Sequence, residues 1–200
     1  MSSKTCYAID PSTSTLLLVD PQLAFGEVIP VPGVELALDN MRRLSGYWRG
    51  HDGRVVLTKH QYDSLEQVGR AADFFGSEIY DLLEAGSPMG KFHPDIYDPA
   101  CDQVIAKTRY DATFGTDLVN QLGQGSVVLV GLTTPICVGG TARGLMAHNI
   151  QVVLAADACA SQDVENFTAE EIHTRELAIL AYSCVEVLTT RQVLSRASIS

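Results

Sequence analysis

Six short apolar runs that recur along the chain constrain its fold more than any other sequence feature. They are rich in leucine or β-branched residues and are continuous rather than alternating, which is typical of strands covered on both faces. The runs are TLLLVD (15–20), RVVLTKH (54–60), QVIAK (103–107), SVVLVG (126–131), QVVLAAD (151–157) and the shorter CVEVLT (184–189). We therefore predict a central, mostly parallel sheet of six strands.

Helical patterns separate these runs, at 33–50, 115–123, 135–149 and 168–183. The last begins with Thr168 and Glu171 in the spacing of a capping box. Alternating strands and helices predict βαβ units, hence an α/β fold with three α/β/α layers and a single domain over residues 1–200. The segment 61–102 is the least regular, and we interpret it as a long excursion with one or two short helices.

Composition narrows the classes of function. The formal net charge of -10 argues against nucleic acid and anionic membrane as partners, because both favour lysine and arginine. No apolar run approaches the roughly 20 residues of a membrane span, and the first residues lack a secretory signal, so we expect a cytoplasmic protein. The five cysteines are odd in number and form no CxxC pair, which argues against a disulfide framework or a zinc knuckle.

Several reactive side chains stand where the predicted strands end. The carboxyl ends of the strands deliver Asp20, His60 with its neighbour Lys59, Lys107 and Asp157, and the fourth strand leads to Cys137. Ligands of parallel sheets bind beyond these ends. An acid, a lysine and a cysteine are therefore expected at one edge of the sheet.

Cys137 is the candidate nucleophile of this set. A helix that begins near Pro135 and the charge of Lys107 would stabilise a thiolate, and Asp20 could accept the proton. Backbone N–H groups of the preceding turn could bind an oxyanion. From placement alone a second interpretation stays open, in which Cys137 fills space, Asp20 caps a turn and Lys107 is solvated.

Four blocks resemble the isochorismatase-like cysteine hydrolase superfamily, which includes N-carbamoylsarcosine amidohydrolase, nicotinamidase, ureidoacrylate amidohydrolase and the isochorismatases. The blocks are LLLVDPQLAF, VIAKTRYDATFGTDL, VVLVGLTTPICVGG and VVLAADACAS. The resemblance implies that Asp20, Lys107 and Cys137 are catalytic. It also implies a cis peptide bond at Leu132–Thr133, an oxyanion hole made by the N–H groups of Thr133 and Cys137, and a homodimer or homotetramer.

A metal site is not expected. Nicotinamidases carry an Asp-x-His motif after the second strand, where this chain reads LTKHQYDS, and its five histidines form no close ligand pair. We therefore predict no metal and no cofactor. His60 is interpreted as a pocket residue, whereas His148 and His173 are expected on helix surfaces.

The residues that select the substrate are less well determined by sequence. The candidates for substrate binding are Gln22, Phe25, His60, Arg109, Tyr110 and Phe114. Arg109 or Arg143 could pair with a substrate carboxylate, but a surface or inter-subunit salt bridge is the preferred interpretation of each. Asp111 stands where many relatives have serine, which adds negative charge near the site.

The sequence thus predicts a cysteine-dependent hydrolase that cleaves a C–N bond in a small amide, ureido or carbamoyl molecule through a thioester. Two alternatives stay open. One is an isochorismatase-type hydrolase of vinyl ethers, in which the thiol is idle. The other is a non-catalytic member of the superfamily that acts as a binding protein.

Overall fold

A computed structural model describes residues 6–122 and 125–197. Its centre is a six-stranded sheet in which every neighbouring pair of strands is parallel. The strands are β1 (Thr15–Val19), β2 (Arg54–His60), β3 (Gln103–Lys107), β4 (Val127–Leu132), β5 (Val152–Ala160) and β6 (Glu186–Leu188), in the spatial order β3-β2-β1-β4-β5-β6. The predicted parallel sheet of six strands is confirmed.

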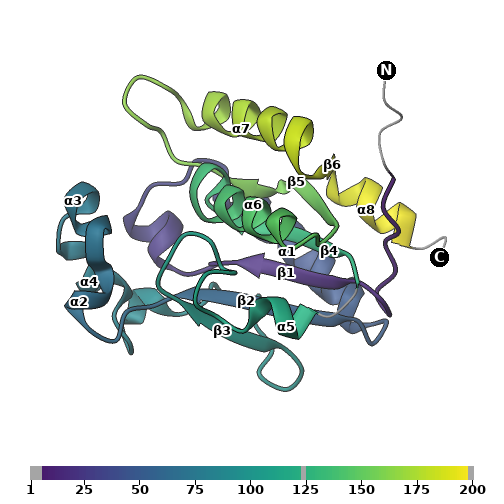
Figure 1. Cartoon of the computed structure of the whole chain (residues 1–200), viewed down its shortest axis with the longest axis horizontal. Helices are drawn as coiled ribbons and strands as arrows, with labels where there is room; N and C mark the ends of the chain where they lie inside the picture. The colour runs from purple at the N-terminus through teal and green to yellow at the C-terminus, as the bar shows by residue number, and fades with distance from the viewer. Residues whose placement is uncertain (1–5, 123–124, 198–200) are drawn as a thin grey trace.

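Helices cover both faces of the sheet (Figure 1). Leu16 and Leu18 of β1 pack into one core with α1 (Val34–Arg49) and α8 (Thr190–Ala197). Leu17 and Val19 pack into the other with α5 (Leu118–Leu122), α6 (Gly139–Ala147) and α7 (Ala169–Ser183). Successive residues of one strand thus enter opposite cores, which explains why the strands have continuous apolar runs. The three-layer α/β/α architecture is confirmed.

The irregular segment contains more helical turns than the sequence predicts. It forms α2 (Leu65–Val68), α3 (Ala72–Phe75) and α4 (Glu78–Leu83), and adds 3-10 turns at Gly69–Ala71 and Pro88–Gly90. In Figure 1 the arrow of β1 points toward the side where these helices gather. They therefore lie beyond the carboxyl ends of the strands, where a substrate would bind.

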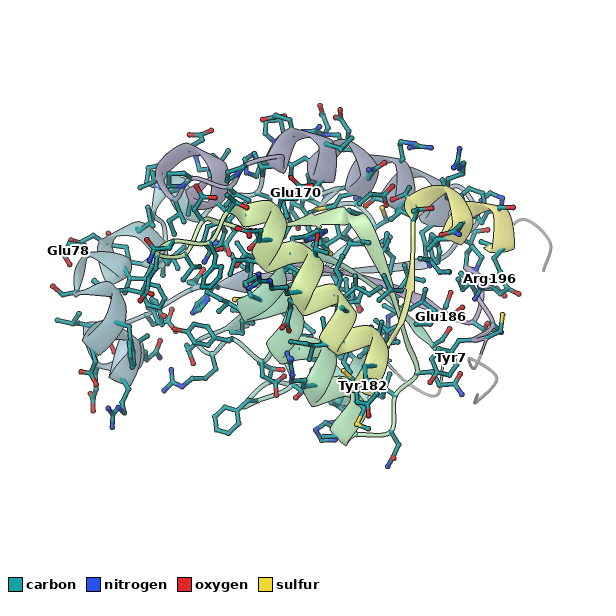
Figure 2. All side chains as sticks on the ribbon, turned by 90° about the horizontal axis from the view of Figure 1, so that it is seen from above. Tyr7, Glu78, Glu170, Tyr182, Glu186 and Arg196 are labelled. Atoms are coloured by element: carbon teal, nitrogen blue, oxygen red, sulfur yellow. The ribbon has the colours of Figure 1, made fainter. Side chains whose placement is uncertain are left out.

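The carboxyl-terminal helix α8 was not predicted, and it brings the two ends of the described chain together. Glu186 pairs with Arg196 at 2.9 Å and accepts a hydrogen bond of 3.0 Å from the backbone N–H of Tyr7. Figure 2 shows these three residues side by side at one end of the molecule. Within the described part of the chain, none of the helices has the length and apolar character needed to cross a membrane.

One predicted strand end is wrong. β5 runs to Ala160, and its register with β4 shifts between Leu129 and Gly131. Asp157 therefore lies inside the strand, and its Oδ1 accepts hydrogen bonds of 2.6 and 2.8 Å from the N–H and hydroxyl of Thr190 at the start of α8. Asp157 orders this helix and does not belong to the edge where Asp20 lies.

Candidate active site

Asp20 follows β1 and is fully buried. Its φ of 47° lies in the left-handed region, which non-glycine residues seldom adopt. The hydroxyl of Thr58, on β2, donates to Asp20 Oδ1 at 2.6 Å and accepts from the Asp20 N–H at 3.1 Å. The sequence analysis did not identify Thr58, which fixes the carboxylate so that its other oxygen, Oδ2, faces Lys107.

Lys107 ends β3 and joins the acid to the thiol. Its Nζ lies 2.7 Å from Asp20 Oδ2 and 3.4 Å from Cys137 Sγ, and it donates to the carbonyl of Arg109 at 2.9 Å. The side chain is fully buried. Burial opposes its charge, but attraction to Asp20 and Cys137 raises the pKa of Lys107 above its ordinary value. The ammonium group is therefore charged at neutral pH.

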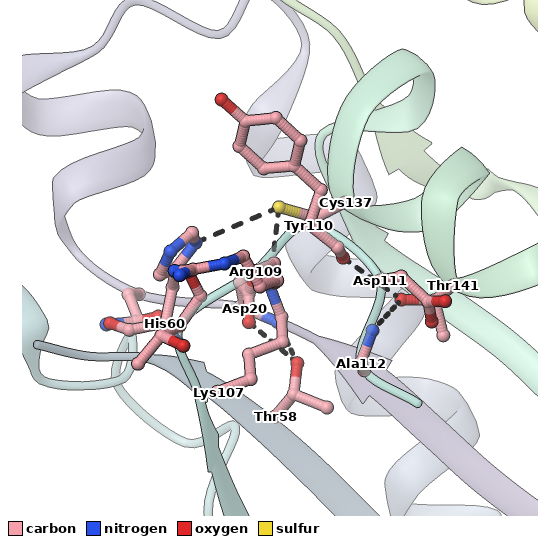
Figure 3. Close-up of polar contacts among 12 residues, drawn as sticks. Asp20, Thr58, His60, Lys107, Arg109, Tyr110, Asp111, Ala112, Cys137 and Thr141 are labelled. Carbon is pink, nitrogen blue, oxygen red and sulfur yellow. Dashed lines mark hydrogen bonds and ion pairs between the residues drawn. The ribbon is translucent and has the colours of Figure 1, made fainter. Parts of the chain in front are cut away.

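Cys137 lies in the helical turn Thr134–Val138, between β4 and α6. Its side chain is buried, and Sγ is 4.0 Å from Nδ1 of His60 (Figure 3). Burial raises the pKa of the thiol to about 12; the charge of Lys107 lowers it and that of Asp20 raises it. The resting thiol is therefore protonated, and it sits next to a carboxylate that can accept its proton.

The backbone before Cys137 has the predicted form, because the Leu132–Thr133 peptide bond is cis. Gly131 has a φ of 135°, and a Cβ there would lie 2.2 Å from the Val19 carbonyl, so only glycine fits. The Thr133 carbonyl accepts hydrogen bonds of 3.2 Å from the N–H groups of Ile136 and Val138. Thr133 and Cys137 both line the same cavity, as an oxyanion hole requires.

A cavity of about 140 Å³ opens over the sulfur. Three of the predicted substrate-binding residues, Phe25, His60 and Tyr110, line it. The sequence analysis missed the other lining residues that matter here, which come from the irregular segment and from the end of β5. They are Tyr62, Ala71, Phe75, Ile79, Leu83 and Gln162.

The other three residues predicted to bind substrate do not line this cavity. Gln22 is buried beneath it, where its side-chain amide bonds the backbone of His60 at 2.7 and 3.0 Å and the Gly90 carbonyl at 3.1 Å. Arg109 donates to the carbonyls of Gln67 and Thr108, both at 2.8 Å, outside the lining. Phe114 is 67% exposed on the surface.

His60 is an uncharged member of the site. Burial and the charge of Lys107 lower the pKa of His60 to about 4, although Asp20 raises it. The Tyr62 ring packs at 5.0 Å from the imidazole and the Tyr110 ring at 6.4 Å. The imidazole is therefore neutral at physiological pH and held between aromatic groups.

The donor atoms of Asp20, His60 and Cys137 lie within 4.8 Å of one another, which is close enough to hold a metal ion. The ammonium group of Lys107 already contacts two of the three, Asp20 at 2.7 Å and Cys137 at 3.4 Å. A divalent cation would therefore face a fixed positive charge at close range. This donor set suits a proton-transfer site better than a metal centre.

The other polar predictions have structural outcomes. Arg143 pairs with Glu176 at 2.6 Å, as the preferred interpretation expected, and His148 is exposed on its helix end. His173 was predicted on a helix surface, but it is half-buried, and its Nδ1 lies 2.8 Å from the hydroxyl of Thr134 in the turn that holds Cys137. Asp111 accepts from the N–H and hydroxyl of Thr113 at 2.8 Å and thus orders its own turn.

The chain belongs to the isochorismatase family of hydrolases, because the model of the Isochorismatase domain matches residues 14–192. The isochorismatase family protein YecD of Escherichia coli O157:H7 is 34% identical over 184 residues, which cover 84% of this chain and 91% of YecD. The phenazine biosynthesis protein PhzD of Pseudomonas fluorescens is 28% identical over 193 residues, and the match covers 94% of this chain and 87% of PhzD.

Two further matches have lower sequence identity. Nicotinamidase 3 of Arabidopsis thaliana is 24% identical, over 86% of this chain and 84% of that protein. The solved structure of a cysteine hydrolase from Pseudomonas syringae pv. phaseolicola 1448A superposes with a TM-score of 0.92 at 22% identity, and the match covers 100% of this chain and 99% of that one. This structural similarity establishes a shared fold.

Proposed function

We propose that the protein is a cysteine-dependent hydrolase that cleaves the C–N bond of a small amide, ureido or carbamoyl substrate. The observation that carries the proposal is the buried chain of contacts from Asp20 Oδ2 to Lys107 Nζ, at 2.7 Å, and from Nζ to Cys137 Sγ, at 3.4 Å. A thiol, an acid and a cation in contact beneath a cavity are the groups that thioester chemistry requires.

The first half of the reaction acylates Cys137. The thiol proton moves to Asp20 while Sγ attacks the substrate carbonyl carbon. The resulting oxyanion accepts hydrogen bonds from the N–H groups of Thr133 and Cys137. Asp20 then returns the proton to the leaving nitrogen as the C–N bond breaks. Because the proton passes from one member of the buried cluster to another, the cluster reaches its thiolate form without gaining net charge, which burial would oppose.

The second half releases the acid. Asp20 accepts a proton from a water molecule as that water attacks the thioester carbonyl. The tetrahedral intermediate collapses, the C–S bond breaks, and Asp20 returns the proton to the sulfur. Lys107 remains charged throughout and stabilises whichever of Asp20 and Cys137 is negative. Similarity to Nicotinamidase 3, a protein named for an amide substrate, supports this reading.

A second candidate function is hydrolysis of a vinyl ether of the isochorismatase type. The match to the Isochorismatase domain favours it. In that reaction Asp20 would act as an acid and the thiol of Cys137 would be idle. The presence of the cysteine in contact with Lys107 favours the amide reaction instead.

The test is a screen of small primary amides, ureides and carbamoyl compounds by ammonia release, with wild-type protein and Cys137→Ser. We expect activity in the wild type that falls at least about 10³-fold in the variant, because a serine hydroxyl is a far weaker nucleophile here. Full activity in Cys137→Ser would reject the thioester mechanism and favour the ether hydrolase. Cys159→Ser is the matched control, since that buried cysteine lies outside the cavity.

A further inference from the structure

The cavity over Cys137 has an uncharged, mainly apolar lining. Its walls are built largely by Phe25, Phe75, Ile79, Leu83 and Ile136. Among the described residues that line it there is no lysine, arginine, aspartate or glutamate side chain. Resting on the proposed cysteine-hydrolase function, we propose that the substrate is an uncharged amide or ureido compound with an apolar acyl group, and that Gln162 recognises its N–H group.

Nearby cations are engaged elsewhere. Lys107 is neutralised by Asp20 at 2.7 Å and lies behind the sulfur rather than in the lining. Arg109 is close enough for its charge to act on His60, but its Nη1 donates to the Gln67 and Thr108 carbonyls, and the side chain lines a neighbouring cavity instead of this one. A substrate carboxylate in this cavity would therefore lose its hydration without gaining a cationic partner from the lining, which is unfavourable.

Two polar atoms in this apolar setting have no hydrogen-bond partner. They are Nε2 of His60, on a side chain only 4% exposed, and the buried Oε1 of Gln162. The Thr108 carbonyl is near enough to raise the pKa of His60, yet no group has hydrogen-bond geometry to Nε2. Buried polar atoms are nearly always satisfied, so these two indicate a ligand with complementary groups.

The state of Cys137 decides which groups are complementary. His60 carries one ring proton, because its pKa of about 4 keeps it neutral. In the resting site the protonated thiol faces Nδ1 at 4.0 Å, so the ring proton is favoured on Nε2, which is therefore a donor. Gln162 Oε1 is an acceptor. An acceptor beside the nucleophile matches an N–H donor of an amide or ureido group, which esters and ethers lack.

The volume limits the acyl group. A dry cavity of roughly 150 Å³ with apolar walls accommodates benzene, and the cavity here measures about 140 Å³. The site therefore suits a single ring or a branched chain of similar bulk. Aromatic walls from Phe25 and Phe75 favour such groups further.

The experiment compares two amides of matched shape, isocaproamide and succinamate, which differ in carrying an isopropyl group or a carboxylate. Ammonia release is measured with wild type, Cys137→Ser and Arg109→Gln. We expect kcat/KM for isocaproamide to exceed that for succinamate at least about 100-fold, because the carboxylate finds no partner. Equal or better cleavage of succinamate that depends on Cys137, whether or not it also depends on Arg109, would overturn the inference but leave the proposed function standing.

A second pair of probes separates failure of the inference from failure of the proposed function. Isocaproaldehyde and succinic semialdehyde should add to a nucleophilic thiol as hemithioacetals and protect Cys137 from alkylation. Stronger protection by isocaproaldehyde is expected. Protection by neither aldehyde, with Cys137 alkylated no faster than Cys184, would reject the nucleophile itself. Equal protection by both would reject only the apolar specificity.

Two variants test the recognition groups. Ile79→Arg adds a guanidinium to the half-buried edge of the lining and should raise kcat/KM for succinamate at least about tenfold. Gln162→Leu should lower kcat/KM for isocaproamide about tenfold but leave methyl isocaproate, which has no N–H, nearly unchanged. Gln61→Leu, outside the lining, is the control. Equal losses on amide and ester in Gln162→Leu would assign Gln162 a structural role and contradict the proposal.

Discussion

Two cysteines at neighbouring strand ends show what burial alone does and what it does not do. Cys137 follows β4, and Cys159 lies in β5 opposite Gly131. Their side chains are 4% and 5% exposed and join the same hydrophobic core. Burial is the main reason why the pKa of each thiol is raised to about 12.

Their surroundings differ in the groups that can move a proton. Cys137 contacts Lys107 at 3.4 Å, lies within 4.8 Å of Asp20, and faces a cavity. Cys159 has the backbone of Gly131 and the charge of Asp157 beside it, and it does not line that cavity. Burial thus raises the pKa of both thiols, but of the two only Cys137 has a cation beside it to stabilise its anion, and that cation contacts the acid that can accept the proton.

The largest expected difference is in activity. Cys137→Ser should lower kcat/KM at least about 10³-fold, whereas Cys159→Ser should change it less than about threefold and cost about 1 kcal/mol of unfolding free energy. Steady-state ammonia release and urea denaturation measure the two effects. A large loss of activity in Cys159→Ser, with its fold intact, would break the contrast.

Removal of Lys107 should make the surroundings of Cys137 resemble those of Cys159. Lys107→Met leaves the buried carboxylate of Asp20 without its partner, so we expect the free energy of unfolding to fall by about 3 kcal/mol. Activity should fall at least about 100-fold even at temperatures where the variant is folded. The double variant Asp20→Asn/Lys107→Met should recover part of the stability and none of the activity, since it removes both charges.

His60, beside Cys137, makes the stability of the protein depend on pH, and no such histidine is described beside Cys159. Its pKa falls from 6.5 to about 4 on folding, so the unfolded chain binds the proton more readily. The contribution of His60 to stability is therefore complete above pH 6.5 and is lost as pH falls toward 4, by about 3 kcal/mol. Urea denaturation of wild type and His60→Gln across that range isolates the effect. Parallel pH profiles of the two proteins would contradict it.

The smallest expected effect concerns the acid beside Cys159. Asp157 caps the start of α8 through Thr190, so Asp157→Ala should cost about 1 kcal/mol of stability and leave kcat/KM unchanged. Thermal denaturation and ammonia release together test this. A drop in activity at unchanged stability would contradict this structural role and favour the position beside Asp20 that the sequence predicted for Asp157.

The strands and the meeting of Asp20, Lys107 and Cys137 at one edge were predictable because they depend on local pattern, whereas the roles of these three residues came from the family resemblance. The continuous apolar runs predict strands buried on both faces, and the residues after those strands, Asp20, Lys107 and Cys137, meet wherever a parallel sheet ends. The position of Asp157 was not predictable, because the register shift of β5 depends on its pairing with β4. Helix α8 was not predicted because its eight residues span little more than two turns, which is too short for a clear helical period.

The cavity was only half predictable for a related reason. Phe25 and Tyr110 follow strand ends directly, whereas Phe75, Ile79 and Leu83 come from the irregular segment, whose short helices have no clear period. Gln22 and Arg109 are residue types that often bind ligands. Here the Gln22 side-chain amide and Arg109 Nη1 form hydrogen bonds with backbone groups instead. Hydrogen bonds to distant backbone atoms depend on the tertiary fold and leave no pattern in the sequence.

The most direct test of the account is the rate of alkylation of Cys137 by iodoacetamide, read by peptide mass spectrometry in wild type and Asp20→Asn, with Cys159 as the internal reference. Because the charge of Asp20 raises the pKa of Cys137 and that of Lys107 lowers it, removal of the acid should speed alkylation of Cys137. The same variant should lose amide hydrolysis, since the proton acceptor is gone. Hydrolysis that survives in Asp20→Asn would contradict a nucleophile whose proton is carried by Asp20. Slower alkylation of Cys137 in that variant would contradict the effect of the Asp20 charge on the pKa of the thiol.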